Sequence, residues 1–210
     1  MRNVIDLMVT YTCMALGLVA AIIGVRSYGS ELGNTARESS AGLPLSSYFV
    51  GKHLAELPSI VIYSFLYCVS FYLICSPASD FGAFFAVILL FEWVMFGVGA
   101  VSSVLLASSQ SNALLCAAIS ALLGGLATDN DGFVKSLCWA RWASEALFLS
   151  ESRLDLLPEP VKSNTQAYLT LANKFDKDAY NTDILALVIY GIVLRVLAFA
   201  IMSRKFRQQK

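Results

Sequence analysis

The stretch FGAFFAVILLFEWVMFGVGAVSSVLLA, residues 81–107, decides what class of protein this chain is. Its single ionisable side chain is Glu92, and the rest of the run is apolar or small. A helix rises ~1.5 Å per residue, so the run is long enough to cross the ~30 Å hydrocarbon core of a bilayer. Backbone polar groups in lipid must be satisfied inside the segment. The run therefore predicts a transmembrane α-helix rather than a barrel strand.

Further apolar runs lie on either side of this one, at residues 4–25, 57–75, 113–127 and 184–202. The run at 113–127 is short and would span the membrane only with help from a polar flank or a tilted neighbour. A composition of 57% hydrophobic and 14% charged residues excludes a soluble domain. We therefore expect an integral, multi-pass, all-α protein: a single transmembrane domain, 1–210, with about five transmembrane helices.

The net charge of the chain limits the partners that we expect. Fifteen Lys and Arg offset fifteen Asp and Glu, so nucleic acid is not an expected partner.

The first run resembles a signal peptide, but Asp6 and the length of the run favour a retained span. Three cysteines lie inside apolar runs and are expected to be packing residues, whereas Cys75 and Cys138 leave a disulfide open.

The basic tail SRKFRQQK, residues 203–210, directly follows the last run and predicts a cytoplasmic C-terminus. Counting back through five spans places the loop 26–56 in the cytoplasm. The long segment 128–183 then lies outside as a re-entrant piece and an external cap. The first span would begin outside, which makes the sequence look like the tail of a longer protein.

Within the cytoplasmic loop, Gly42 and Pro44 break any continuous helix. Ser46-Ser47 is expected to cap a new interfacial helix near Tyr48 that leads into the second span. This helix is expected to be two-faced, with Phe49, Leu54 and Leu57 on one side and Lys52, His53 and Glu56 on the other. Spacing alone favours a different interpretation, a plain solvated connector with a snorkelling Lys52.

Several motifs then occur in a fixed order. The loop contains Glu31, Arg37-Glu38, Gly42, Tyr48-Phe49, Lys52 and Pro58. Residues 139–147, WARWASEAL, and residues 193–199, VLRVLAF, follow later in the chain. Together these motifs resemble ABC transporters of the G subfamily, the White and breast-cancer-resistance-protein type. The pattern is most similar to plant and protist half-transporters.

The resemblance implies an incomplete type-2 ABC exporter membrane domain that works as a homo- or heterodimer. It implies that the loop forms a coupling helix resting on a nucleotide-binding domain, with Glu31, Arg37, Glu38, Gly42 and Tyr48 as the coupling residues. It also implies a central cavity for lipids, sterols or amphipathic compounds. By the same resemblance, that cavity is lined by Tyr11, Met14, Leu115, Ile119 and Leu122.

No phosphate-binding loop, G-x-x-x-x-G-K-[ST], occurs in the sequence, since Gly51-Lys52 is followed by His53. No catalytic set and no metal-ligand cluster is apparent either. ATP and Mg²⁺ are therefore expected on a nucleotide-binding domain outside this chain, and the family's first span is also missing. The alternative is a truncated, non-transporting partner or regulator of an intact half-transporter.

Two intramembrane polar residues stand out. Glu92 is costly in lipid, and we expect it either to line a cavity or to be hydrogen-bonded between helices. Arg195 lies within the last span, and a pair with Glu92 is one option.

Small residues in the first and third runs predict close helix packing, among them Gly17, Ala21, Gly97 and Gly99. Trp139 and Trp142 predict a helical face at the membrane interface.

Overall fold

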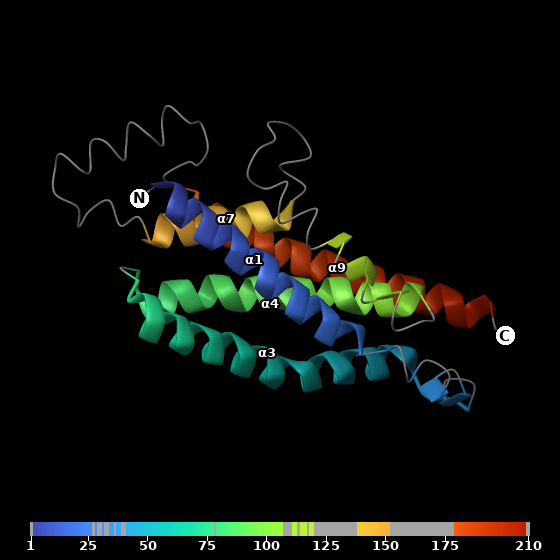
Figure 1. The fold of residues 1–210 in the computed structure, drawn as a ribbon. Helices are drawn as coiled ribbons and strands as arrows, with labels where there is room; N and C mark the ends of the chain where they lie inside the picture. The colour runs from blue at the N-terminus through green and yellow to red at the C-terminus, as the bar shows by residue number, and fades with distance from the viewer. Residues whose placement is uncertain are drawn as a thin grey trace.

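The regular secondary structure of the described residues is helical (Figure 1). The computed structural model describes residues 2–26, 28, 31, 34–35, 37–38, 41–77, 79–106, 111–112, 114–116, 118–119, 138–151 and 179–208. The helices are α1 (Arg2–Val25), α3 (Leu45–Cys75), α4 (Phe81–Leu105), α7 (Trp139–Glu151) and α9 (Tyr180–Gln208). Within this part of the chain, no β-strand is present.

Three of these helices, α3, α4 and α9, are long and apolar enough to cross a membrane. The second half of α1, Tyr11–Val25, is a shorter apolar helix. The expected all-α integral membrane fold is therefore confirmed. Most of the run at 113–127 lies outside the described residues, although residues 111–112, 114–116 and 118–119 are helical.

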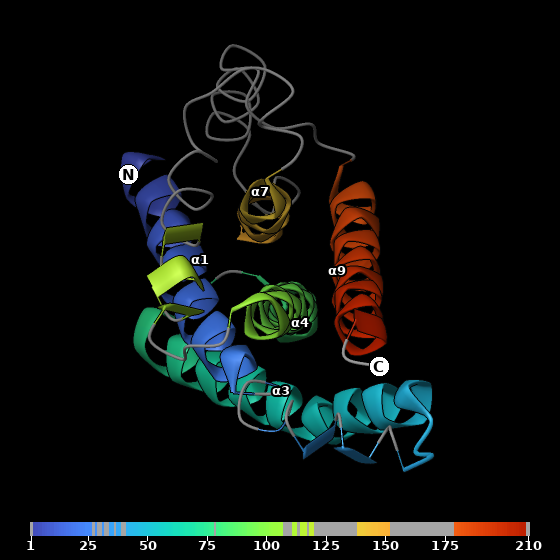
Figure 2. The same cartoon turned by 90° about the vertical axis from the view of Figure 1, so that its right-hand side faces the viewer.

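Helix α4 is the centre of the bundle (Figure 2). Of its most apolar window, 67% is buried inside the protein, against 17% for the corresponding windows of α3 and α9. Helices α1, α3, α7 and α9 surround it. The outer faces of α3 and α9 carry exposed aliphatic and aromatic side chains, as expected for surfaces in contact with lipid.

Helices α4 and α9 run in the same direction. Near their starts, the hydroxyl of Tyr180 donates to the carbonyl of Ala83 (3.2 Å), and near their ends Lys205 Nζ donates to the carbonyl of Val104 (3.1 Å). The chain that joins them therefore begins on one side of the bundle and ends on the other. The predicted span at 113–127 stays a prediction. We call the side that holds the ends of α1, α4 and α9 and the start of α3 the loop end.

The packing of α1 on α4 confirms the prediction from the small residues. A Cβ added at Gly99 would lie 2.3 Å from the carbonyl oxygen of Ala21, and one at Gly24 would lie 2.6 Å from that of Phe96. Gly17 contacts Met95 and Phe91. Glycine at these positions lets the two backbones approach closely, which is a common basis for helix association in membranes.

Helix α3 differs from the expected pair of segments. A single helix begins at Leu45 and continues through Pro58 to Cys75. The expected cap at Ser46-Ser47 is wrong, because the N-cap residue is Pro44 and no side chain caps the helix. The fixed φ of proline, here −69°, suits a helix start without a side-chain cap. The helix crosses the bundle obliquely, and its start lies beside the end of α9 (Figure 2).

Candidate functional site: a polar and aromatic cluster at the loop end

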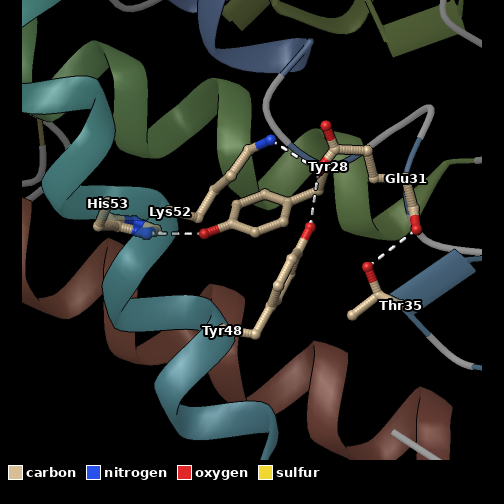
Figure 3. Close-up of polar contacts among 6 residues, drawn as sticks. All are labelled: Tyr28, Glu31, Thr35, Tyr48, Lys52 and His53. Carbon is tan, nitrogen blue, oxygen red and sulfur yellow. Dashed lines mark hydrogen bonds and ion pairs between the residues drawn. The ribbon is translucent and has the colours of Figure 1, made fainter. Parts of the chain in front are cut away.

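Five side chains meet where the chain between α1 and α3 folds back onto α3 (Figure 3). Tyr28 and Glu31 come from the loop, and Tyr48, Lys52 and His53 come from the first turns of α3. Tyr48 and Lys52 are four positions apart on the helix, so one face of α3 presents both to the loop. We call this set the loop-end cluster.

Glu31 forms the polar half of the loop-end cluster. Lys52 Nζ lies 2.7 Å from Glu31 Oε2, and the hydroxyl of Tyr48 donates to the same oxygen at 2.9 Å. The hydrogen bond from Lys52, followed by that from Tyr48, lowers the pKa of the Glu31 carboxyl below its ordinary value. Thr35 donates to the backbone carbonyl of Glu31 (2.9 Å), which fixes the turn that carries the carboxylate.

Tyr28 forms the buried half of the loop-end cluster. Its side chain is fully buried, and its hydroxyl shares a hydrogen bond with His53 Nδ1 at 2.7 Å. Its ring stacks on Phe49, with ring centroids 5.7 Å apart and an interplanar angle of 9°. Burial raises the pKa of the Tyr28 hydroxyl, so the residue is a neutral phenol at physiological pH.

The same aromatic residues reach α9. Phe49 packs edge to face on Phe199, with ring centroids 5.3 Å apart. Met202 and Phe206 of α9 are buried in the same apolar cluster as Tyr28 and Phe49. The loop is therefore fixed at once to the start of α3 and to the end of α9.

The loop-end cluster contains two of the predicted coupling residues, Glu31 and Tyr48. Arg37 and Glu38 lie in a short helical turn and are exposed. Gly42 is also exposed and has a φ of 111°, a left-handed conformation that favours glycine. The structure thus separates residues that hold the loop from residues that the loop presents to its surroundings.

Sequence reasoning missed Tyr28 and Thr35 and left His53 as an interfacial residue. The only local signal for Tyr28 was an aromatic residue just beyond the end of an apolar run. Its partners are 20 or more positions away, so no helical spacing reveals them. The expected two-faced helix is also wrong. Phe49 is buried against His53, with ring centroids 4.3 Å apart, while Leu54 and Leu57 are exposed.

The predicted cavity residues are not brought together by any contact in the described part of the chain. Tyr11 is 64% exposed on α1, and Met14 is half-buried. Leu115 is exposed, whereas Ile119 packs partly against the main core. Leu122 lies outside the described residues. The cavity assignment therefore stays a prediction.

Glu92 and Arg195 have different partners, so a pair between them is wrong. Ser64 of α3 donates to Glu92 Oε2 at 2.9 Å, which matches the expectation of a carboxyl hydrogen-bonded between helices. Arg195 donates to the carbonyls of Gly191 (3.0 Å) and Trp93 (3.1 Å), and its guanidinium lies 4.0 Å from the centroid of the Trp93 ring. Glu92 therefore links α4 to α3, and Arg195 links α9 to α4.

The cysteines form no disulfide. All five are free, with Cys75 exposed and Cys138 buried, so a bond between these two is absent. Cys13, Cys68 and Cys116 are buried, as expected for packing residues. In the described ranges, no group of three or more His, Cys, Asp or Glu side chains could hold a metal ion.

Comparison with known families accounts for this arrangement. Residues 4–209 match the family described as ABC-2 type transporter. This chain belongs to the ABC-2 type transporter family. An ABC-2 membrane domain is consistent with both the helical bundle and the exposed apolar faces of α3 and α9.

Similar proteins support the G-subfamily resemblance. The chain is 23% identical over 191 residues to ABC transporter G family member 25 of Oryza sativa subsp. japonica, covering 90% of this chain and 18% of that protein. It is 23% identical over 195 residues to putative white-brown complex homolog protein 30 of Arabidopsis thaliana, again covering 90% and 18%. The ABC-type transporter claG of Penicillium crustosum is 30% identical over 146 residues, or 65% of this chain and 20% of that protein. The chain thus spans about a fifth of the length of these relatives.

Proposed function

We propose that this ABC-2 membrane domain is the membrane-spanning part of an ATP-driven exporter of lipids, sterols or other amphipathic small molecules. It would act as one half of a dimer. A nucleotide-binding domain outside this sequence would hold ATP and Mg²⁺, and the residues of this chain would convert its movement into movement of the helices. The names of the relatives and the membrane fold support the proposal.

The observation that carries the proposal is the double attachment of the loop. Glu31 ties it to α3 through Lys52 and Tyr48, and Tyr28 ties it to α3 and α9 through Phe49 and the surrounding apolar residues. A domain that docks on the exposed turn at Arg37 and Glu38 would therefore move two transmembrane helices together. Such a rigid-body shift at an interface is a common way of coupling two states.

The apolar surface at the other proposed site suits an amphipathic substrate. Tyr11 of α1 and Leu115 beyond α4 are exposed, and each presents an aromatic or aliphatic side chain. In a dimer, such side chains could contact a flat or lipidic molecule without hydrogen-bond selectivity. This part of the proposal rests on the type of side chain alone.

Labelling of intact cells tests the orientation on which the coupling depends. Cys75 is exposed at the end of α3 opposite the loop end, so the proposal expects a membrane-impermeant maleimide to modify it from outside. In a Cys75→Ser background, an Arg37→Cys variant should react only after the membrane is permeabilised. Labelling of Arg37→Cys in intact cells would refute the proposal, because the loop could then meet no cytoplasmic domain.

Transport in reconstituted membranes tests the activity. The full polypeptide or complex that supplies the nucleotide-binding domain is placed in liposomes, and movement of fluorescent phospholipid and sterol analogues is followed with ATP and with a non-hydrolysable analogue. ATP-dependent movement that falls when Glu31→Ala and Tyr28→Ala are introduced supports the proposal. ATP-independent movement, or none, would favour a channel or a non-transporting partner instead.

A further inference from the structure

The last turns of α9 form an ordered helix that extends past the apolar span. One face of this helix is buried in the same apolar cluster as Tyr28 and Phe49. Its residues recur every four positions: Ala198, Met202 and Phe206. Lys205 Nζ donates to the carbonyl of Val104 at the end of α4. A cation at that position also offsets the partial negative charge of a helix C-terminus. The basic end of α9 is therefore held in place.

Arg204 lies on the opposite side of this helix. It is exposed, and at 100° per residue it is turned ~200° from the buried Met202. Within the described part of the chain, no carboxylate pairs with it. The sequence adds Arg207 and Lys210 and contains no Asp or Glu after Asp183. With Lys205 engaged on α4, Arg204 leaves a positive charge at the end of α9 that no carboxylate of the described residues offsets.

The depth of this turn in a membrane follows from α3. Exposed apolar side chains run along α3 from Leu54 to Ile74, beyond Lys52 and His53 of the loop-end cluster. Positions 54 to 74 rise ~30 Å, which matches the thickness of the hydrocarbon core. Leu54 therefore marks the boundary of the hydrocarbon at the loop end. Phe49 lies more than one turn before Leu54 and packs on Phe199 of α9, so the turn of α9 beyond Phe199 lies at the level of the headgroups.

We propose that the loop-end turn of α9, centred on Arg204, binds the headgroups of anionic phospholipids in the adjacent leaflet. A guanidinium pairs with a phosphate through two parallel N–H groups, and a cluster of basic residues directly after a span attracts acidic lipids. The burial of Phe206 and the bond from Lys205 to α4 fix the turn in advance, so little order has to be created on binding. The bound lipid would in turn stabilise the junction of α9 with the loop-end cluster. This inference depends on membrane insertion and not on transport.

Electron paramagnetic resonance with spin-labelled lipids tests the proposal on the full chain in phosphatidylcholine membranes. The spectra give the association constant of phosphatidylserine relative to phosphatidylcholine. We expect phosphatidylserine to be preferred severalfold at ~0.15 M salt. The preference should largely disappear at ~1 M salt, where the Debye length falls from ~8 Å to ~3 Å.

Variants separate this site from the general effect of a charged surface. Removing one cation weakens the attraction of an anionic headgroup, so Arg204→Gln should lower the preference. Arg204→Lys keeps the charge but loses the paired N–H groups, so it should lower the preference less. The combined variant Arg204→Gln, Arg207→Gln, Lys210→Gln should abolish it. Arg26→Gln, an exposed cation at the end of α1, is the matched control and should leave most of the preference intact.

Three results would overturn the proposal. They are equal affinity for the two lipids in the unaltered chain, a preference that survives in the triple variant, and a loss in Arg26→Gln as large as that in Arg204→Gln. Lys205 is left unchanged in these variants, because its bond to Val104 is structural. The helical circular dichroism signal of each variant in the same membranes shows whether it has folded.

Discussion

Replacing Tyr28 should release the loop from the bundle while leaving the transmembrane helices in place. Tyr28 is fully buried, and its ring contacts Phe49, Tyr48 and His53. Tyr28→Phe keeps the ring and loses only the hydrogen bond to His53, a change of about 1 kcal/mol. Tyr28→Ala also removes a buried aromatic ring, and such truncations cost about 3–5 kcal/mol.

Trypsin cleavage at Arg37 reports this release, because Arg37 is exposed and lies in the turn that the loop carries. The carbonyl of Arg37 accepts a hydrogen bond from the amide of Ala41 (3.0 Å), so cleavage requires that the turn opens. When opening is fast, the cleavage rate follows the population of the open form. At ~1.4 kcal/mol per factor of ten, Tyr28→Phe should be cleaved about fivefold faster and Tyr28→Ala at least ~100-fold faster.

Tyr11→Ala is the matched control, because Tyr11 is 64% exposed on α1 and far from the loop. Its cleavage at Arg37 should equal that of the unaltered protein. Equal rates for Tyr28→Ala and the unaltered protein would refute the reasoning, since Tyr28 would then hold nothing. Faster cleavage in Tyr11→Ala as well would show that the loop opens by unfolding of the whole bundle.

Three further predictions follow from the contacts. The pKa of Glu31 is lowered in the folded protein, so its contribution to loop stability is present at neutral pH and lost as the pH falls below the ordinary value of 4.5. Hydrogen exchange of the loop amides, corrected for intrinsic rates, should lose protection over that window in the unaltered protein and not in Glu31→Gln; equal pH profiles would contradict this. Gly99→Ala should lower the melting temperature, because its Cβ would meet the backbone of α1, whereas Gly51→Ala has open space and should raise it slightly; equal shifts would disprove the close crossing. Arg195→Lys should destabilise the bundle by about 1–3 kcal/mol in denaturant titrations, since one ammonium cannot match a fork that joins two carbonyls and lies on the Trp93 ring; a neutral effect would show that charge alone suffices.

The sequence was sufficient for the membrane helices because their signal is local. The runs that form α3, α4 and α9 are long enough to cross the hydrocarbon core, and the run at 81–107 corresponds closely to α4, Phe81–Leu105. The small residues of the first and third runs also predicted a close crossing, and Gly24 and Gly99 confirm it. Both inferences use only spacing along one helix, which the sequence states directly.

The start of α3 was harder to predict because proline and serine give conflicting signals there. Ser46 and Ser47 are typical caps, yet Pro44 precedes them and provides the helix start itself. Pro58, which was named only as part of the family motif, lies inside α3 and does not end the helix. Local propensity thus located the helix but not its first residue.

The loop-end cluster could be predicted only in part. Glu31, Tyr48 and Lys52 stood out because a resemblance to a known family marked them. Tyr28 makes its contacts through tertiary packing, and a lone aromatic residue in a loop has no periodic signal. The same limit applies to Arg195, whose partner Trp93 is 102 positions away. A sequence shows which polar groups need partners, while the fold decides which partners they find.

The two halves of the loop-end cluster differ in strength, and this difference decides how movement would pass through it. The side chains of Lys52 and Glu31 are 25% and 47% exposed, and ion pairs with that much solvent contact are worth about 0.2–1 kcal/mol. The buried rings of Tyr28 and Phe49 are worth several times more by the truncation costs above. In the proposed coupling, the ion pair would therefore set the orientation of the loop, and the aromatic packing would carry the force to α3 and α9. A Lys52→Met variant should keep most of the loop's protection from trypsin, whereas Phe49→Ala should lose it as fully as Tyr28→Ala does. The reverse order would show that charge, not packing, holds the loop.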